Sequence, residues 1–185
     1  LLAAPEGLIA LAGSGRHIYV LGYWGHVLYQ YDIKTGQARS VKVGAVGGHV
    51  SRNILADGRG HVYVPQVQAG AGGGQPAASL VEYDADLNEV ARRPLRYYLD
   101  GRPAAAHGIT GFACLPDGSI AFITHNGYLS LIRPSGDAPA EVTDLGWFHP
   151  AGPVYCASLF ADETGRFLMG AANGGWRRDF EWVVY

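Results

Sequence analysis

Three histidines stand at comparable places in the sequence, which makes imidazole the first candidate for chemistry. His49, His107 and His149 each come shortly before an apolar segment that is expected to form a strand. A neutral imidazole binds transition metals, and it also serves as an acid or a base near neutral pH. The three residues are therefore candidate ligands of a divalent metal ion, and His107 and His149 are candidate catalytic groups. The alternative is that each one only caps its connector by hydrogen bonding to a turn.

A second group of side chains suits the binding of a small or carbohydrate-like ligand. Arg52 carries a planar set of donors that fits a carboxylate or a sulfate, although it would equally pair with an acidic residue of a neighbouring strand. Aromatic rings often form the walls of small-ligand sites, and packing is their alternative role. The candidate ligand-binding residues are Trp24, His26, Arg52, Asn53, His125, Asn126 and Tyr155.

Composition narrows the class of protein that presents these residues. The 27 glycines and 10 prolines are too many for a mostly helical chain of 185 residues. The 14 basic and 16 acidic residues are balanced, so we expect no nucleic-acid partner. Charged residues and glycines interrupt the apolar stretches before the ~20 residues that a membrane helix needs, and no membrane span is expected. The two cysteines indicate neither a disulfide framework nor a cysteine zinc site, and the compartment stays open.

Internal repetition is the strongest structural signal. A turn followed by a short apolar strand occurs four times, with strands that begin at Ile18, Val62, Ile120 and Phe167. The spacings between these starts are 44, 58 and 47 residues. A second apolar strand follows each one, and most units have room for four strands. A period of roughly 40 to 50 residues with four strands per unit is typical of a β-propeller blade.

We therefore expect an all-β fold, a β-propeller of four-stranded antiparallel blades in a single segment over residues 1–185. A two-sheet sandwich is the alternative, but it does not account for the repeated turns. Propellers close as rings of about 4 to 8 blades, so we expect part of a six- to eight-bladed ring, with the remaining blades as partners, rather than a closed four-bladed ring. Strand Ile18 to Leu21 is apolar on both faces, as expected for a sheet between two neighbours. The four blades are expected at residues 8–46, 50–96, 109–148 and 155–185, the last incomplete.

The third unit carries the closest resemblance to a known group of propellers. From Ile109 to Gly136 the sequence contains Leu-Pro-Asp-Gly-Ser-Ile-Ala-Phe-Ile-Thr and then Gly-Tyr-Leu-Ser-Leu-Ile-Arg-Pro-Ser-Gly. This text resembles the blades of the NHL, SMP-30/gluconolactonase and streptogramin lyase group. The resemblance implies a propeller fold and, for an enzyme, a lyase or hydrolase acting on a small or carbohydrate-like anionic substrate. Ala121 and His125 stand where streptogramin lyase blades commonly carry Trp and Glu, and no SMP-30 metal ligands are carried over.

The order of the strands predicts which end of the propeller carries the site. Because strands run up and down, the loops after the second and fourth strands of each blade lie on one face, and the tight turns lie on the other. The longer loops are where binding is expected. We interpret that face as a ligand-binding site on a scaffold, and the alternative is a lyase or hydrolase with a histidine-bound metal. The histidines on that face are His26, His49, His107, His125 and His149.

Overall fold

The computed structural model describes residues 7–22, 26–44, 53–68, 77–95, 98–99, 102–103, 108–173 and 180–185. Regular structure in these ranges consists of β-strands alone, and antiparallel four-stranded sheets form most of it. No segment in them forms a helix that is long and apolar enough to span a bilayer. The all-β propeller fold expected from the sequence is therefore confirmed.

The first two sheets run in simple chain order. Each strand pairs antiparallel with the next one along the sequence. The first sheet contains β1 (Leu8–Ser14), β2 (His17–Gly22), β3 (Val27–Asp32) and β4 (Ala38–Lys42). The second contains β5 (Leu55–Ala56), β6 (Val62–Gln68), β7 (Ala77–Tyr83) and β8 (Glu89–Pro94).

The third sheet repeats this order, and the fourth varies it. In the fourth sheet β15 and β16 both pair with β17 on the edge opposite β18, so they form one interrupted innermost strand. A short hairpin joins the second and third sheets: β9 (Tyr98–Leu99) and β10 (Arg102–Pro103). The third sheet contains β11 (Ile109–Cys114), β12 (Ile120–Thr124), β13 (Tyr128–Ser135) and β14 (Ala138–Trp147). The fourth contains β15 (Tyr155–Cys156), β16 (Phe160–Ala161), β17 (Leu168–Asn173) and β18 (Glu181–Val184).

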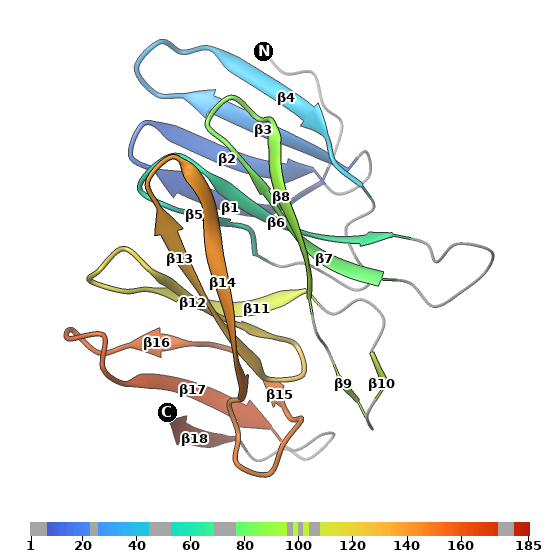
Figure 1. The fold of residues 1–185 in the computed structure, drawn as a ribbon, viewed down its shortest axis with the longest axis vertical. Helices are drawn as coiled ribbons and strands as arrows, with labels where there is room; N and C mark the ends of the chain where they lie inside the picture. The colour runs from blue at the N-terminus through green and yellow to red at the C-terminus, as the bar shows by residue number, and fades with distance from the viewer. Residues whose placement is uncertain are drawn as a thin grey trace.

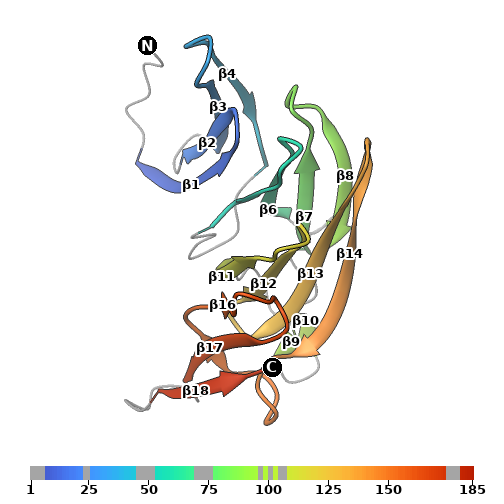
Figure 2. The same cartoon turned by 90° about the vertical axis from the view of Figure 1, so that its left-hand side faces the viewer.

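The four sheets fan out as an open arc (Figure 1, Figure 2). In Figure 2 the innermost strands lie on the left, and β4, β8 and β14 lie on the outer side. The innermost strands of adjacent sheets are in contact: β1 contacts β5, and β11 contacts β16. The first and fourth sheets lie at opposite ends of the arc.

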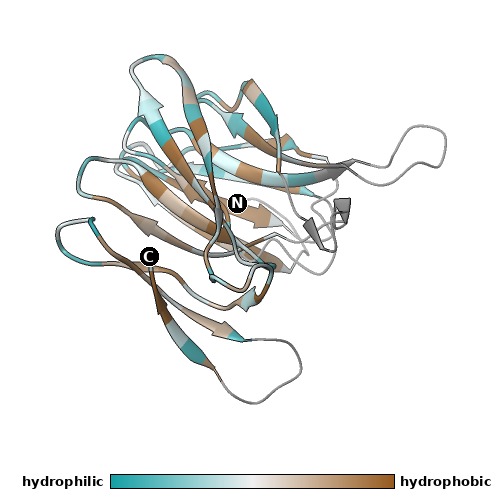
Figure 3. Ribbon diagram, turned by 60° about the horizontal axis from the view of Figure 1, so that its bottom comes forward, coloured by the Kyte–Doolittle hydropathy of each residue, from teal (hydrophilic) through white to brown (hydrophobic). Residues whose placement is uncertain are grey.

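Three buried apolar clusters lie between successive sheets and hold the arc together. One joins the first two sheets, with Tyr19 and Leu21 against Val62 and Val64. The clusters between the later sheets are built in the same way. Figure 3 shows hydrophobic segments along the strands and hydrophilic turns at their ends. Because burial of apolar area is the main favourable term in folding, each sheet depends on its neighbours for stability.

Tight turns connect the first and second strands of every sheet. Each of these turns contains a glycine with positive φ, at Gly15, Gly60, Gly118 and Gly165. Side chains rarely adopt this backbone conformation, so glycine is the residue that allows the reversal. These glycines lie in the turns that the sequence repeat predicted before each second strand.

The innermost strand of the second sheet is short: from residue 53 onward it consists of β5 at Leu55–Ala56. One strand expectation needs correction. Burial on both faces is found in β12, where all five residues are buried, and not in β2. In β2, Ile18 and Val20 are only half-buried, because the first sheet lies at the end of the arc and the described residues include no sheet beyond it.

Candidate functional site

Four polar or aromatic side chains meet at the connector end of the third and fourth sheets. His125 and Asn126 form the turn between β12 and β13, Tyr155 begins β15, and Asn173 ends β17. The ring centroids of His125 and Tyr155 are 4.8 Å apart. His125 Nδ1 lies 3.5 Å from Asn126 Oδ1, and Tyr155 is paired with Asn173 across the sheet. We call these four residues the connector cluster.

Main-chain hydrogen bonds fix the position of the connector cluster. The connector from Phe148 to Val154 wraps around the β12–β13 turn: Val154 N–H donates to Asn126 O at 3.1 Å, and Phe148 N–H donates to Gly127 O at 2.9 Å. Gly127 has a φ of +79°, and a Cβ at this residue would lie 2.6 Å from Val154 O. Glycine is therefore required where the connector crosses the turn.

The side-chain amide of Asn126 is the unusual group of the cluster. Asn126 is only 7% exposed, and its Nδ2 has no hydrogen-bond partner in the part of the chain that the structure describes. A buried polar group without a partner costs roughly 1 to 3 kcal/mol. A buried donor of this kind calls for an explanation, and an acceptor supplied by a bound molecule or by water is one.

An open groove lies beside the connector cluster, between the third and fourth sheets. It has a volume of about 480 Å³ and contains a histidine–glutamate pair in which His149 Nε2 lies 2.9 Å from Glu181 Oε1. Ala151 N–H donates to His149 Nδ1 at 3.0 Å, so the proton of a neutral ring lies on Nε2 and points to Glu181. The groove is lined by Trp147, Phe148, His149, Pro150, Glu181, Trp182, Val183, Val184 and Tyr185.

The structure brings together three of the residues that the sequence nominated for ligand binding, His125, Asn126 and Tyr155. Asn53 lies elsewhere, beside the innermost strand of the second sheet, where its Nδ2 donates to Ile109 O at 3.1 Å and so links the second and third sheets. His26 directly precedes β3 of the first sheet, and its main-chain O accepts from Val43 N–H at 2.7 Å.

Four nominated residues lie outside the described residues: Trp24, His49, Arg52 and His107. Within the described ranges, no group of three or more His, Cys, Asp or Glu residues is placed to hold a metal ion. The three-histidine metal site, which includes His149, therefore stays a prediction. Ala151 N–H occupies His149 Nδ1, so a metal ion would bind at Nε2, where the Glu181 carboxylate would be a second ligand.

Asn173 and Glu181 are members of the site that the sequence analysis did not nominate. A signal for Asn173 exists in the repeat, because it follows the buried Ala172 as His125 follows the buried Thr124. Glu181 gives no such signal. Its approach to His149 depends on the pairing of β17 with β18, which aligns Ala172 with Glu181.

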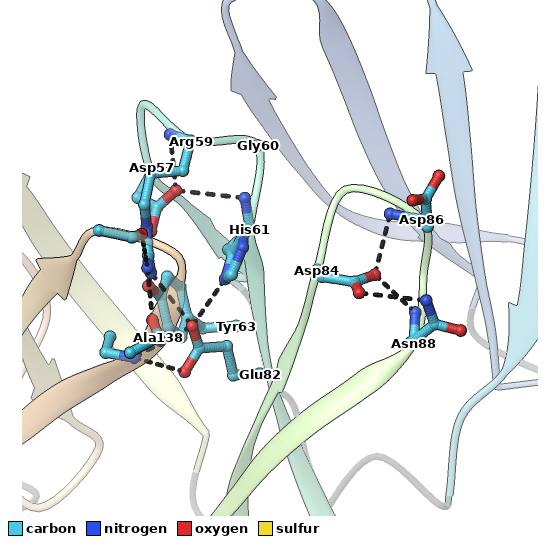
Figure 4. Close-up of polar contacts among 12 residues, drawn as sticks. Asp57, Arg59, Gly60, His61, Tyr63, Glu82, Asp84, Asp86, Asn88 and Ala138 are labelled. Atoms are coloured by element: carbon cyan, nitrogen blue, oxygen red, sulfur yellow. Dashed lines mark hydrogen bonds and ion pairs between the residues drawn. The ribbon is translucent and has the colours of Figure 1, made fainter.

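A denser polar cluster lies at the tight-turn end of the second and third sheets (Figure 4). Tyr63 OH donates to Asp57 Oδ2 at 2.6 Å, and Arg59 donates to the same oxygen at 2.8 Å. Glu82 Oε1 accepts from Arg59 at 3.1 Å and contacts His61 Nδ1 at 2.7 Å. Burial and then the hydrogen bond to Asp57 raise the pKa of Tyr63 far above its usual range. Burial alone would raise the pKa of Asp57, but hydrogen bonds from Tyr63 and Arg59 outweigh it, and that pKa is lowered.

This second cluster joins neighbouring sheets. Ala140 N–H of the third sheet donates to Glu82 Oε2 at 2.9 Å, and Arg59 donates to Ala138 O at 2.7 Å. The first sheet uses the equivalent residues in the same way, because Gln30 donates to Ala85 O of the second sheet at 2.8 Å. Since every strong contact is made to another part of the scaffold, we interpret the cluster as structural. We call Asp57, Arg59, His61, Tyr63 and Glu82 the sheet latch.

Comparison with known proteins identifies the fold and no family. No protein-family model matches the chain, and no curated protein matches its sequence. Among solved structures it is similar to the Dos1 propeller, with a TM-score of 0.67 and 11% identity over 99% of this chain and 47% of that one. It is also similar to KlAtg21 in complex with the coiled coil of AgAtg16, with a TM-score of 0.59 and 15% identity over 92% of this chain and 50% of that one.

A third neighbour is the dihydro-heme d1 dehydrogenase NirN in complex with DHE, with a TM-score of 0.62 and 20% identity. That match covers 95% of this chain and 35% of the other. The chain thus spans about half the length, or less, of these three neighbours. Identities at this level establish the β-propeller scaffold alone.

Proposed function

We propose that this chain is a ligand-binding β-propeller scaffold whose site is the connector cluster and the adjoining groove. The ligand is a small polar molecule, of carbohydrate-like size, that offers a hydrogen-bond acceptor. The observation that carries the proposal is the buried amide of Asn126, which has no acceptor among the described residues although it lies at the meeting point of three chain segments.

The surroundings of Asn126 suit an acceptor on a flat polar ligand. The rings of His125 and Tyr155 lie together at 4.8 Å and offer an aromatic surface next to the amide. Trp147 and Trp182 line the groove farther out. Aromatic surfaces with a few fixed polar groups are typical of sugar and small-ligand sites.

Binding fits the geometry of His149 better than catalysis does. An imidazole that acts as an acid or base needs one nitrogen directed at the substrate. In His149, Ala151 N–H occupies Nδ1 and Glu181 faces Nε2. The pair therefore favours a fixed wall of the groove, and lyase or hydrolase activity is kept as an outcome of the experiment below. The resemblance to the NHL, SMP-30 and streptogramin lyase propellers likewise rests on the sequence of the repeats, loosely in all four units and closely in the third.

The solved structures of two similar propellers contain different kinds of partner. NirN is in complex with DHE, and KlAtg21 is in complex with a coiled coil. We favour a small ligand for this chain because the group that lacks an acceptor is buried within a turn, and the flat surface of a protein partner would not reach it.

Nuclear magnetic resonance titration tests the proposal with D-glucuronate as the probe and D-glucose as its neutral match. Glucuronate is expected to shift the side-chain amide signals of Asn126 and the ring signals of His125 and Tyr155. Asn126→Ala is expected to weaken binding at least about tenfold, which corresponds to the loss of one hydrogen bond in a buried site. The variant should fold, because Nδ2 has no partner to lose among the described residues and the contact between Oδ1 and His125 Nδ1 is long, at 3.5 Å. Asn88→Ala, in an exposed turn, is the control and should bind normally.

Two results would overturn the proposal. One is the absence of any shift in these signals up to about 10 mM of either sugar. The dissociation constant would then lie above the range that a specific site requires. The other is loss of the glucuronate signals with new product signals in their place, which would show an enzyme.

A further inference from the structure

Both polar atoms of the Asn126 side chain have unused hydrogen-bonding capacity. Among the described residues Nδ2 has no partner, and the polar contact of Oδ1 is with His125 Nδ1 at 3.5 Å. That separation is long for a hydrogen bond, whose usual length is about 2.9 Å. An asparagine amide offers two donors and two acceptor positions. A donor and an acceptor therefore stand side by side on one residue that is only 7% exposed.

Two buried glutamines show how the scaffold normally uses the donor of a side-chain amide. Gln30 Nε2 donates to Ala85 O of the second sheet at 2.8 Å. Gln66 Nε2 donates to Tyr83 OH on the neighbouring strand at 2.8 Å. Contacts between strands and sheets thus account for both of these amides, and they leave the amide of Asn126 unexplained.

The charges near Asn126 favour a neutral acceptor. Burial of a carboxylate without a cationic partner costs far more than burial of a hydroxyl. Within the part of the chain that the structure describes, no Lys or Arg lines the groove beside the connector cluster, and Glu181 and His149 are the pair found there. Arg133 and Arg166 lie toward the tight turns, at the other end of the third and fourth sheets. A hydroxyl oxygen therefore matches Asn126 Nδ2 better than a carboxylate oxygen does.

We propose that Asn126 recognises two neighbouring hydroxyls on a neutral sugar-like ring, an inference that rests on the function proposed above. Nδ2 donates to the oxygen of one hydroxyl, and the second hydroxyl donates to Oδ1. The amide matches such a pair because each hydroxyl both donates and accepts. The rings of His125 and Tyr155, with centroids 4.8 Å apart, provide an apolar surface for the C–H face of the sugar. The ligand class is a neutral polyhydroxylated ring, to which a carboxylate adds no affinity.

Nuclear magnetic resonance titration with three methyl glycosides tests this inference. The probes are methyl α-D-glucopyranoside, its 3-deoxy analogue and the methyl α-glycoside of D-glucuronate. The 3-deoxy analogue has no two neighbouring hydroxyls and should bind at least about tenfold more weakly than the glucoside, because one hydrogen bond in a buried site is lost. The glucuronate glycoside keeps the hydroxyl pairs and should bind within about threefold of the glucoside, because its carboxylate meets no cation.

Substitution of Asn126 separates recognition of the hydroxyl pair from other contacts with the ring. In Asn126→Ala the glucoside and its 3-deoxy analogue should bind within about twofold of each other, because the group that distinguishes them is gone. Asn88→Ala, in an exposed turn, is the control and should keep the tenfold preference. The comparison of the three probes on the unsubstituted chain needs no variant, so it decides the question even where a substitution disturbs folding.

The outcomes separate this inference from the proposed function. The hydroxyl-pair inference is wrong if the unsubstituted chain binds the 3-deoxy analogue as tightly as the glucoside, or the glucuronate glycoside tenfold more tightly. A ligand-binding site would remain in either case. A preference for the glucoside that persists in Asn126→Ala would also overturn the inference, because another group would then recognise the pair. Absence of shifts with all three probes up to about 10 mM would overturn the proposed function together with the inference.

Discussion

Glu82 is the residue on which the sheet latch depends most. The residue is only 1% exposed. Its carboxylate accepts hydrogen bonds from Arg59 of the second sheet and from the main-chain N–H of Ala140 in the third sheet. It also faces His61 Nδ1 at 2.7 Å. Glu82→Ala would leave the Ala140 N–H and the His61 ring buried without this acceptor. We therefore expect a large loss of stability from one substitution.

The contacts of Glu82 set the size of the expected effect. Removal of one partner from a buried, charged hydrogen-bonded group destabilises a protein by about 3 to 5 kcal/mol. Glu82→Gln keeps the shape and one acceptor, as Gln30 does at the equivalent place in the first sheet, and should cost about 1 to 2 kcal/mol. Glu89→Ala removes an exposed pair with Arg92 and should change stability by no more than about 0.5 kcal/mol.

Urea denaturation at one fixed protein concentration measures these differences. With a slope of about 2 kcal/mol per molar, Glu82→Ala should lower the midpoint by roughly 1.5 to 2.5 M, Glu82→Gln by less than about 1 M, and Glu89→Ala hardly at all. The reasoning is refuted if Glu82→Ala lowers the midpoint no more than Glu89→Ala does. That result would mean that the latch forms without holding the sheets together.

Two further predictions concern the same interfaces between sheets. A Cβ on Gly111 would lie 2.6 Å from the main-chain nitrogen of Leu159, so Gly111→Ala should force the third and fourth sheets apart. The free energy of unfolding, measured by urea denaturation, should fall by about 1 to 3 kcal/mol. Gly58→Ala is the control, because a Cβ there meets nothing within 4 Å, and it should change this free energy by no more than about 0.5 kcal/mol. The pKa of Asp57 is lower in the folded protein than its ordinary value of 3.8, so its carboxylate contributes stability that is present above about pH 4 and lost as the pH falls through the lower folded pKa. Thermal unfolding should therefore show that Asp57→Asn is less stable than the unsubstituted chain near neutral pH. Between about pH 4 and 2 the variant should lose less stability than the unsubstituted chain does. An equal loss of stability in that pH range would contradict this prediction.

Local sequence was sufficient for the elements of the fold. The four positive-φ glycines, Gly15, Gly60, Gly118 and Gly165, stand in the turns that the repeat predicted, because a tight reversal constrains only a few adjacent residues. The apolar strands that follow them are present as well. The same local pattern included His125, Asn126 and Tyr155 among the seven candidate ligand-binding residues.

Burial on each face was decided by the neighbouring sheets. Strand Ile18 to Leu21 and strand Ile120 to Thr124 are both strongly apolar in sequence, yet only the second is buried at every residue. The difference comes from position in the arc, because the third sheet has neighbours on two sides and the first sheet, within the described residues, has one. No pattern within a strand records how many sheets flank it.

Partners of the polar side chains likewise depended on the tertiary structure. Glu82 meets Ala140, 58 residues away, and His149 meets Glu181 through the pairing of β17 with β18. Asn53 has the polar character of a ligand-binding residue, but its Nδ2 bonds to the main chain of the next sheet at Ile109. The sequence determined that these groups are polar and close to turns. The packing of the sheets decided which of them bonds to a neighbouring sheet and which, like the amide of Asn126, has no acceptor among the described residues. A hydrogen bond depends on distances that only the packed arc defines.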